Sequence, residues 1–224
     1  KISKVGDGSR VKGLLEKRAF VELEKYLNEK EGKSLKGMPA LQTTVMERYG
    51  MGKAMLEAGL DVTFGDFMFA LGLPFTFKTL AQARFLAALL LPVVSLMPFS
   101  WLYPLGSDQD KPPQPKWTKY YQQSYVIAGD FLQIRDHMPD DLTGKIIVTN
   151  TTTPEDVAQF KAAGVKYLLT TTPVLDGRSF GTNMMEAALI AVSGKKRKLT
   201  YAEIFGRPGA LNVSNVEEVT GRPK

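Results

Sequence analysis

Cysteine is absent from the 224 residues of this sequence, and histidine occurs once, at His137. Without cysteine the chain has no disulfide framework, no thiolate nucleophile and no zinc–thiolate site. A single histidine excludes histidine-cluster metal centres and argues against catalysis by a histidine base. We therefore expect no metal site, and we expect the chemistry to come from carboxylates, amides and hydroxyls.

The sequence also lacks a basic face interleaved with aromatic residues, although its net charge is +6 and its pI about 9.3. Basic residues are scattered, apart from the run at 195–198. Such a run is usually a solvated helix end, and the alternative is a contact with anionic lipid or nucleic acid. We expect no nucleic-acid partner.

A signal peptide is missing as well, and the sequence begins with Lys1. This indicates either that a leader was removed or that the sequence is a piece of a longer protein. We expect a cytoplasmic location, or an organelle stroma or matrix if a leader was removed. The content of 44% hydrophobic and 23% charged residues is typical of a globular chain.

The stretch 39–66 has the outline of a βαβ nucleotide-binding unit: strand, glycine turn, helix, strand. Gly50 and Gly52 stand in the turn, and the second strand ends on Asp66. In such units the glycines approach a pyrophosphate and the carboxylate binds a ribose. The third glycine position falls on Met55, and the alternative is that the glycines only permit a tight turn. The predicted segments are 39–45, 47–52, 53–59 and 60–66.

Further strands and helices alternate along the chain, which predicts an α/β fold: a Rossmann-like open parallel sheet of about five strands with flanking helices. A long amphipathic helix precedes the βαβ unit, and charges that include Glu16 and Lys17 are predicted on its outer face. We assign residues 1–198 to one domain and 199–224 to a polar tail with little to bury. The remaining predicted elements are a helix at 10–31, strands at 124–130, 144–150 and 165–173, and helices at 131–142, 153–164 and 184–195.

An apolar insertion interrupts this alternation at 85–105, where only three polar side chains occur in 21 positions. Three prolines, among them Pro92, argue against a single membrane-spanning helix. We weigh a buried helix that packs on the sheet or on a partner subunit, an interfacial membrane contact, and a true span. A proline-rich loop follows and extends the insertion to residue 117.

Four predicted strands end in a polar residue: Asp66, Asp130, Asn150 and Thr172. In an open parallel sheet those ends share one edge, and ligands bind in the crevice beside it. The alternative for the two aspartates is that each only caps the helix that follows it. The repeated Gly-Asp-Phe at 65–67 and 129–131 fits that capping role.

A loop of small residues precedes the last predicted helix and is a candidate anion site, for a phosphate or a carboxylate. Capping without a ligand is the alternative. Its residues are Arg178, Ser179, Gly181 and Thr182.

Short motifs are distributed along the chain: RYGMG, GDFMFALGLP, FSWLYP, AGDFLQIR, TNTTTPEDV, LLTTTP and GRSFGTN. Through these motifs, nearly the whole chain resembles a bacterial group that is labelled quinate 5-dehydrogenase by homology. Around Asp-Gly-Ser at 7–9, the helix and the glycine-turn βαβ unit, the chain is also similar to the shikimate/quinate dehydrogenase family.

This resemblance implies an NAD(P)-binding oxidoreductase. It places Asp7 at the catalytic aspartate, whose partner lysine belongs to an upstream substrate domain that does not precede Lys1 here. It matches Gly50 and Gly52 in part to the cofactor turn. Asn150-Thr151-Thr152 resembles the family's Asn-x-Thr at a strand end, which implies that Asn150 and Thr151 lie beside the cofactor.

Two hypotheses follow. The first is an NAD(P)-dependent oxidoreductase acting on a CH–OH group, or the cofactor-binding part of one. It favours NAD over NADP, because apolar residues and not arginine follow Asp66. The second is a non-catalytic Rossmann-like protein that binds a nucleotide or nothing. That protein would associate through 85–105 as a homo-oligomer, with a partner subunit or with a membrane surface.

Overall fold

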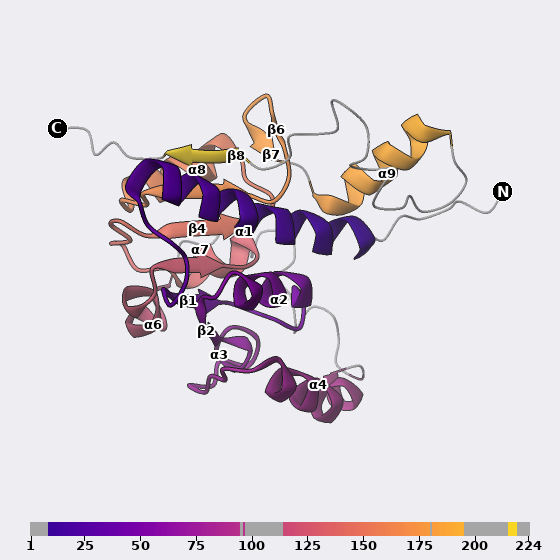
Figure 1. The fold of residues 1–224 in the computed structure, drawn as a ribbon. Helices are drawn as coiled ribbons and strands as arrows, with labels where there is room; N and C mark the ends of the chain where they lie inside the picture. Colours follow the sequence, from indigo (N-terminus) through magenta and orange to yellow (C-terminus); the bar gives the residue numbers. More distant parts are fainter. Residues whose placement is uncertain (1–8, 95, 97–113, 180, 195–214, 219–224) are drawn as a thin grey trace.

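A computed structural model of the chain describes residues 9–94, 96, 114–179, 181–194 and 215–218. Helices cover both faces of a six-stranded sheet in the order β2-β1-β3-β4-β5-β8 (Figure 1). The first five strands of that order are parallel, and β8 is antiparallel to β5. The predicted Rossmann-like α/β fold is confirmed. The strands are β1 (Pro39–Gln42), β2 (Asp61–Phe64), β3 (Val126–Ala128), β4 (Ile146–Thr149), β5 (Tyr167–Thr170) and β8 (Asn215–Glu218).

Alternate residues of the central strands face the two helical layers. Ala40 and Val126 pack with α1 (Ser9–Glu31), α2 (Tyr49–Glu57) and α4 (Leu80–Val94). Leu41 and Ile127 pack with the second layer. Because both faces are buried, the strands read as apolar runs. The second layer consists of α3 (Asp66–Leu71), α6 (Thr118–Gln123), α7 (Phe131–His137) and α8 (Pro154–Ala162).

The long helix α1 spans the sheet and is held at its C-terminal end. The carboxylate of Glu31 accepts hydrogen bonds from Lys166 Nζ and from the Tyr167 hydroxyl, both at 2.6 Å. The hydrogen bond from Lys166, with those from Lys33 and Tyr167, lowers the pKa of Glu31 to about 2. This contact ties α1 to the start of β5.

The C-terminal part of the chain adds elements that the hydrophobic pattern does not show. A short hairpin of β6 (Val174–Leu175) and β7 (Arg178–Ser179) follows β5 and leads into α9 (Thr182–Ser193). Residues 199–224, predicted as a tail outside the domain, supply β8, which pairs with the open side of β5. Backbone hydrogen bonds to β5 hold β8 in the sheet. Such bonds require little burial of apolar side chains, so a polar segment can form this strand.

The apolar insertion forms α4 and continues beyond the described residues. Ala83 and Leu86 are buried against the first layer, while Phe85 and Leu89 are 73% and 61% exposed. Within the described part of the chain, no helix has the length and apolar character needed to cross a membrane. Residues 97–105 of the predicted insertion and Asp7 lie outside the described residues.

Candidate functional site

The carboxyl ends of the parallel strands form one edge of the sheet. Asp66, Asp130 and Asn150 follow β2, β3 and β4 within two residues, and Thr172 stands two residues beyond β5. The predicted common edge is therefore confirmed. The topological switch point of the sheet lies between β1 and β3. Strand β2 is added on one side of β1, and β3, β4 and β5 are added in turn on the other side. Ligands of open α/β sheets bind at such points.

The two glycines of the predicted turn lie inside the first turn of α2, which begins at Tyr49. A Cβ atom on Gly50 would lie 2.7 Å from Glu16 Oε2 and 3.0 Å from the Cα of Gly13, both in α1. The absence of a side chain at Gly50 thus allows α1 to pack directly on the start of α2. In a dinucleotide-binding unit the pyrophosphate of the cofactor packs against such a glycine. Here helix α1 packs against it instead.

Gly52 and Met55 complete this packing from the other side of α2. A Cβ atom on Gly52 would lie 2.6 Å from Gln42 Oε1 and 2.7 Å from Val45 Cγ2. Met55 is fully buried in the core between the sheet and α1. Both residues therefore contribute to close contact of helix and strand.

A carboxylate of the chain itself occupies the N-terminus of α2. Glu16, which the pattern placed on the outer face of α1, is 1% exposed. It accepts a hydrogen bond from Arg48 Nη1 at 3.1 Å, and its Oε2 lies against Gly50 in the first turn of α2. Burial raises the pKa of Glu16, and the charge of Arg48 opposes that rise. The partial positive charge of this helix terminus is thus already compensated.

Asp66 accepts hydrogen bonds from backbone amides of the loop between β1 and α2. Its carboxylate accepts hydrogen bonds from the amides of Val45, at 3.0 Å, and Met46, at 2.9 Å. The side chain is buried, which raises its pKa, while these amides lower it. With Glu16 and Asp66 in place, the residues of this corner do not fit a pyrophosphate.

Asp130 begins α7 and accepts a hydrogen bond from the amide of Leu132 at 3.1 Å, which confirms its role as a cap. Its other oxygen faces Arg48 Nη2 at 3.7 Å and accepts from Asn150 Nδ2 at 3.4 Å. Because 17% of the Asp130 side chain stays exposed, capping leaves room for a ligand contact. The ends of β3 and β4 are thus joined by polar groups that solvent can reach.

The switch point also gathers ionisable groups that we did not predict. Lys12 Nζ donates to the backbone carbonyl of Glu47 at 2.7 Å, and Gln133 Nε2 donates to the Glu47 carboxylate at 3.3 Å. Burial, then the charge of Arg48, lowers the pKa of Lys12. Glu47 as a whole residue is exposed. Partial desolvation of its carboxyl group raises its pKa, and the negative charge of Asp130 raises it further. The only sequence signal was the Glu-Arg pair at the start of the predicted turn, two residues before Gly50.

The residues of the predicted anion loop have different environments. Ser179 is buried; its hydroxyl donates to the carbonyl of Asn150 at 2.5 Å and accepts from the amide of Thr152 at 2.7 Å. Arg178 is exposed. Thr182 is buried in the first turn of α9. Ser179 therefore fixes the loop to the end of β4 and is not itself available to a ligand.

The N-terminus of α9 and the end of β5 lie at the same corner. Gly181 is the N-cap of α9, and no side chain caps that helix. A Cβ atom on Gly181 would lie 3.9 Å from Thr151 Oγ1. The buried hydroxyls of Thr171 and Thr172 have no hydrogen-bond partner within the described part of the chain.

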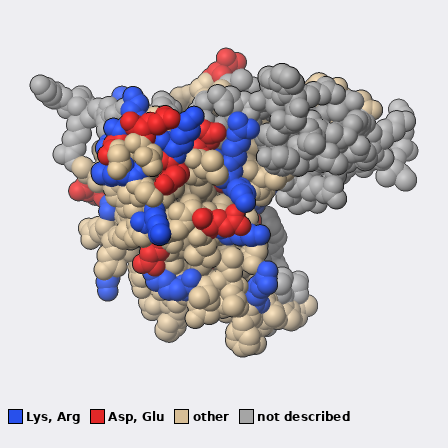
Figure 2. All heavy atoms as spheres, viewed as in Figure 1, with Lys and Arg blue, Asp and Glu red and all other residues tan. Residues whose placement is uncertain are grey.

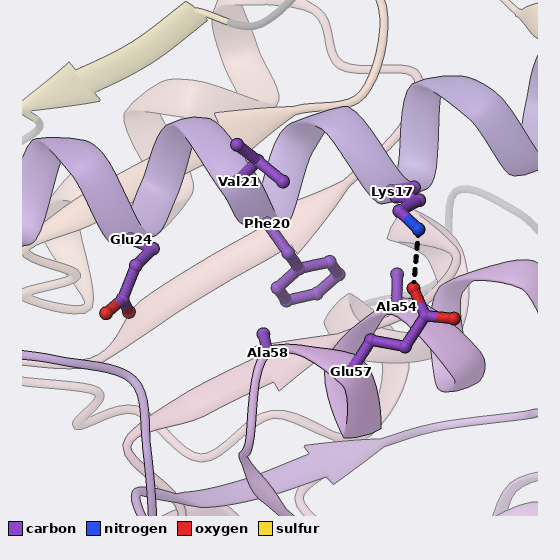
Figure 3. A pocket seen from close by; sticks show the side chains of 7 residues that line it. All are labelled: Lys17, Phe20, Val21, Glu24, Ala54, Glu57 and Ala58. Atoms are coloured by element: carbon purple, nitrogen blue, oxygen red, sulfur yellow. Dashed lines mark ion pairs between the residues drawn. The ribbon is translucent and has the colours of Figure 1, made fainter.

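One hollow of about 320 Å³ lies between α1 and the C-terminal half of α2 (Figure 3). The ion pair of Lys17 and Glu57, at 2.8 Å, closes one side of it. The hollow lies toward the amino ends of the strands, and it contains none of the predicted site residues. Its lining residues are Lys17, Phe20, Val21, Glu24, Ala54, Glu57 and Ala58. Among the described residues there is no group of three or more histidines and carboxylates that could hold a metal ion.

A family model described as a domain of unknown function (DUF8754) matches residues 10–207. No curated protein matches the sequence. Among solved structures, the chain is similar to one titled as the crystal structure of a galactofuranose binding protein, with 11% identity and a TM-score of 0.36. The similarity covers 93% of this chain and 59% of that one, and it concerns the fold alone.

Proposed function

The chain belongs to the DUF8754 family, and we propose that it is a Rossmann-like ligand-binding protein that holds a nucleotide along the carboxyl edge of its sheet. One observation supports this most directly: Asp130 and Asn150, from the ends of two adjacent strands, are hydrogen-bonded to each other and partly exposed. Thr151, beside them, is exposed. A carboxylate with neighbouring amide and hydroxyl groups suits the hydroxyls of a ribose.

A thermal-shift titration with AMP, NAD and NADP tests this proposal. A ligand at about 100 times its dissociation constant should stabilise the protein by about 2.7 kcal/mol, which raises the melting temperature. Asp130→Asn keeps a good helix cap but removes the charge, so we expect weaker binding with an intact fold. Asp140→Asn, at an exposed position, is the matched control. Absence of a shift with all three compounds would remove the proposal.

The second candidate is an NAD(P)-dependent dehydrogenase of shikimate/quinate type. The ionisable groups of Lys12, Glu47 and Asp130 at the switch point favour it, because hydride transfer from a CH–OH group needs a proton acceptor nearby. It also requires that α1 leave the start of α2, since Glu16 holds the position that a pyrophosphate would take. Reduction of NAD or NADP in the presence of quinate or shikimate would support it. A protein that binds AMP as tightly as NAD, and reduces neither cofactor, would count against it.

The ligand-binding proposal includes association through the apolar surface of α4 and the residues that flank it. Phe75 precedes α4, Phe85 and Leu89 lie in it and Leu96 follows it, and each is at least 60% exposed. The surface over α3 and α4, at the bottom of Figure 2, shows few charged side chains. Exposed apolar patches of this kind mark contacts with proteins or membranes. Leu89→Glu should change the oligomeric state or abolish pelleting with vesicles. Val192→Glu, at an equally exposed position on α9, should change neither.

A further inference from the structure

The helices that begin at the carboxyl edge differ in how their N-termini are satisfied. Asp130 caps α7, and a capping box of Thr153 and Asp156 starts α8. The first turn of α2 meets the carboxylate of Glu16. By contrast, α9 begins at Gly181 without a side-chain cap, as the six-residue α3 does at Gly65, but α9 is 12 residues long. Its N-cap residue therefore supplies no side chain to the first amides or to the helix dipole.

A second observation comes from the end of β5. The hydroxyl oxygens of Thr171 and Thr172 are buried and without a hydrogen-bond partner in the described part of the chain, with residue exposures of 1% and 0%. A buried hydroxyl without a partner is costly, and native proteins keep few of them. These two threonines therefore have hydrogen-bonding capacity that the described residues do not use.

The register of β4 and β5 brings the end of β5 beside Thr151. Thr149 pairs with Thr170, and the Thr171 amide donates to the Thr149 carbonyl at 2.9 Å, so Thr172 follows this pair on β5 as Thr151 does on β4. Thr151 reaches this corner from β4, because its hydroxyl lies 3.9 Å from the position that a Cβ atom of Gly181 would take. Strands β4 and β5 and helix α9 thus converge on one point.

This corner is also held in place without a ligand. Ser179 bonds both the carbonyl of Asn150 and the amide of Thr152, which fixes the segment that leads into α9. The small Gly181 leaves its approach open, since no heavy atom lies closer than 3.9 Å to its Cβ position. A site whose donors are fixed in advance loses little entropy on binding.

We propose that the N-terminus of α9, with the hydroxyls of Thr151 and Thr172, binds the phosphate group of the ligand. Amides at a helix start together with hydroxyl donors are the groups that bind phosphates in proteins. The inference rests on the proposed function and deepens it. The ribose hydroxyls lie at Asp130 and Asn150, and the phosphate lies at Gly181, away from the Asp130 carboxylate.

Amide chemical shifts of the full chain, titrated with inorganic phosphate at constant ionic strength, test this site. We expect saturable shifts at Thr151, Gly181 and Thr182, while Met51 stays unchanged because the Glu16 carboxylate already lies against the first turn of α2. Gly181→Asp supplies a carboxylate of the chain itself at the same point, so it should weaken phosphate binding by about tenfold or more while stabilising α9. Ala188→Asp adds the same charge at an exposed position of α9 and should leave binding unchanged.

Thr172→Val keeps the shape of the side chain and removes its hydroxyl, and should also weaken binding. Shifts that persist in Gly181→Asp, or that spread over surface lysines without saturation, would overturn the proposal. AMP separates this inference from the proposed function. Shifts at Asp130 and Asn150 without a shift at Thr182 would retain the ligand site and reject the phosphate position. Absence of shifts at all three would reject both.

Discussion

Two corners of the same sheet edge treat a helix N-terminus in opposite ways. At the start of α2, the carboxylate of Glu16 lies against the first turn, and Asp66 accepts hydrogen bonds from two amides of the preceding loop. At the start of α9, Gly181 offers no side-chain cap, and the ends of β4 and β5, with Thr151 and the unpaired hydroxyl of Thr172, adjoin it. The glycine turn is therefore closed by the chain itself. The comparison shows that glycines at a strand–helix turn indicate close approach, and that helix α1 can be what approaches.

The largest expected effect concerns the closed corner. Glu16→Ala leaves Arg48 buried with only the more distant Asp130 as a partner, since the Glu16–Arg48 pair is 1% and 5% exposed. Removing one member of a buried pair costs about 3–5 kcal/mol of unfolding free energy. Glu22→Ala, which removes an exposed pair on the same helix, should cost less than about 1 kcal/mol. Urea unfolding measures both, and equal costs would mean that Glu16 does not hold the corner.

Replacing one glycine by alanine at each corner should give the next largest difference in unfolding free energy. Gly52→Ala places a Cβ atom 2.6 Å from Gln42 Oε1, in a fully buried contact. Such overpacking costs about 1–3 kcal/mol. Gly181→Ala meets nothing within 3.9 Å and should cost less than about 1 kcal/mol, from the weaker cap. If Gly181→Ala were the more damaging variant in urea, the α9 corner would not be open.

The smallest expected effect is a change in how the unfolding free energy depends on pH. Burial raises the pKa of Glu16 above its usual 4.5. The stability that this group contributes is then fully present below about pH 4.5 and is lost as the pH rises through the raised pKa. Glu16→Gln cannot titrate, so its unfolding free energy should lack this decline, while Gly181→Ala should keep it. Parallel pH profiles of wild type and Glu16→Gln would contradict the assignment.

The parts of the fold that depend on local pattern could be predicted from the sequence. Buried parallel strands are apolar on both faces, so the sheet was recognisable, and so was the edge that carries Asp130 and Asn150. The start of α8 also follows from local signals, since the Thr153 cap and its acidic first turn are adjacent in sequence. These features need only residues within about one turn of each other.

The features that could not be predicted depend on residues far apart in the chain. Glu16 stands among charges on α1, and only the packing of α1 on Gly50 shows that it is buried. Likewise Asp66 serves a loop 20 residues earlier, and the contacts of Lys12 with Glu47 bridge 35 positions. Strand β8 owes its place to the open side of β5. A single sequence gives no signal of such long-range contacts.

The amide shifts of Met51 and Thr182 on addition of AMP test the central claim most directly, because they report on the two corners in one spectrum. We predict a saturable shift at Thr182 and none at Met51. A shift at Met51 with none at Thr182 would show that the ligand enters the glycine turn, which would contradict the closed corner and the proposed site together.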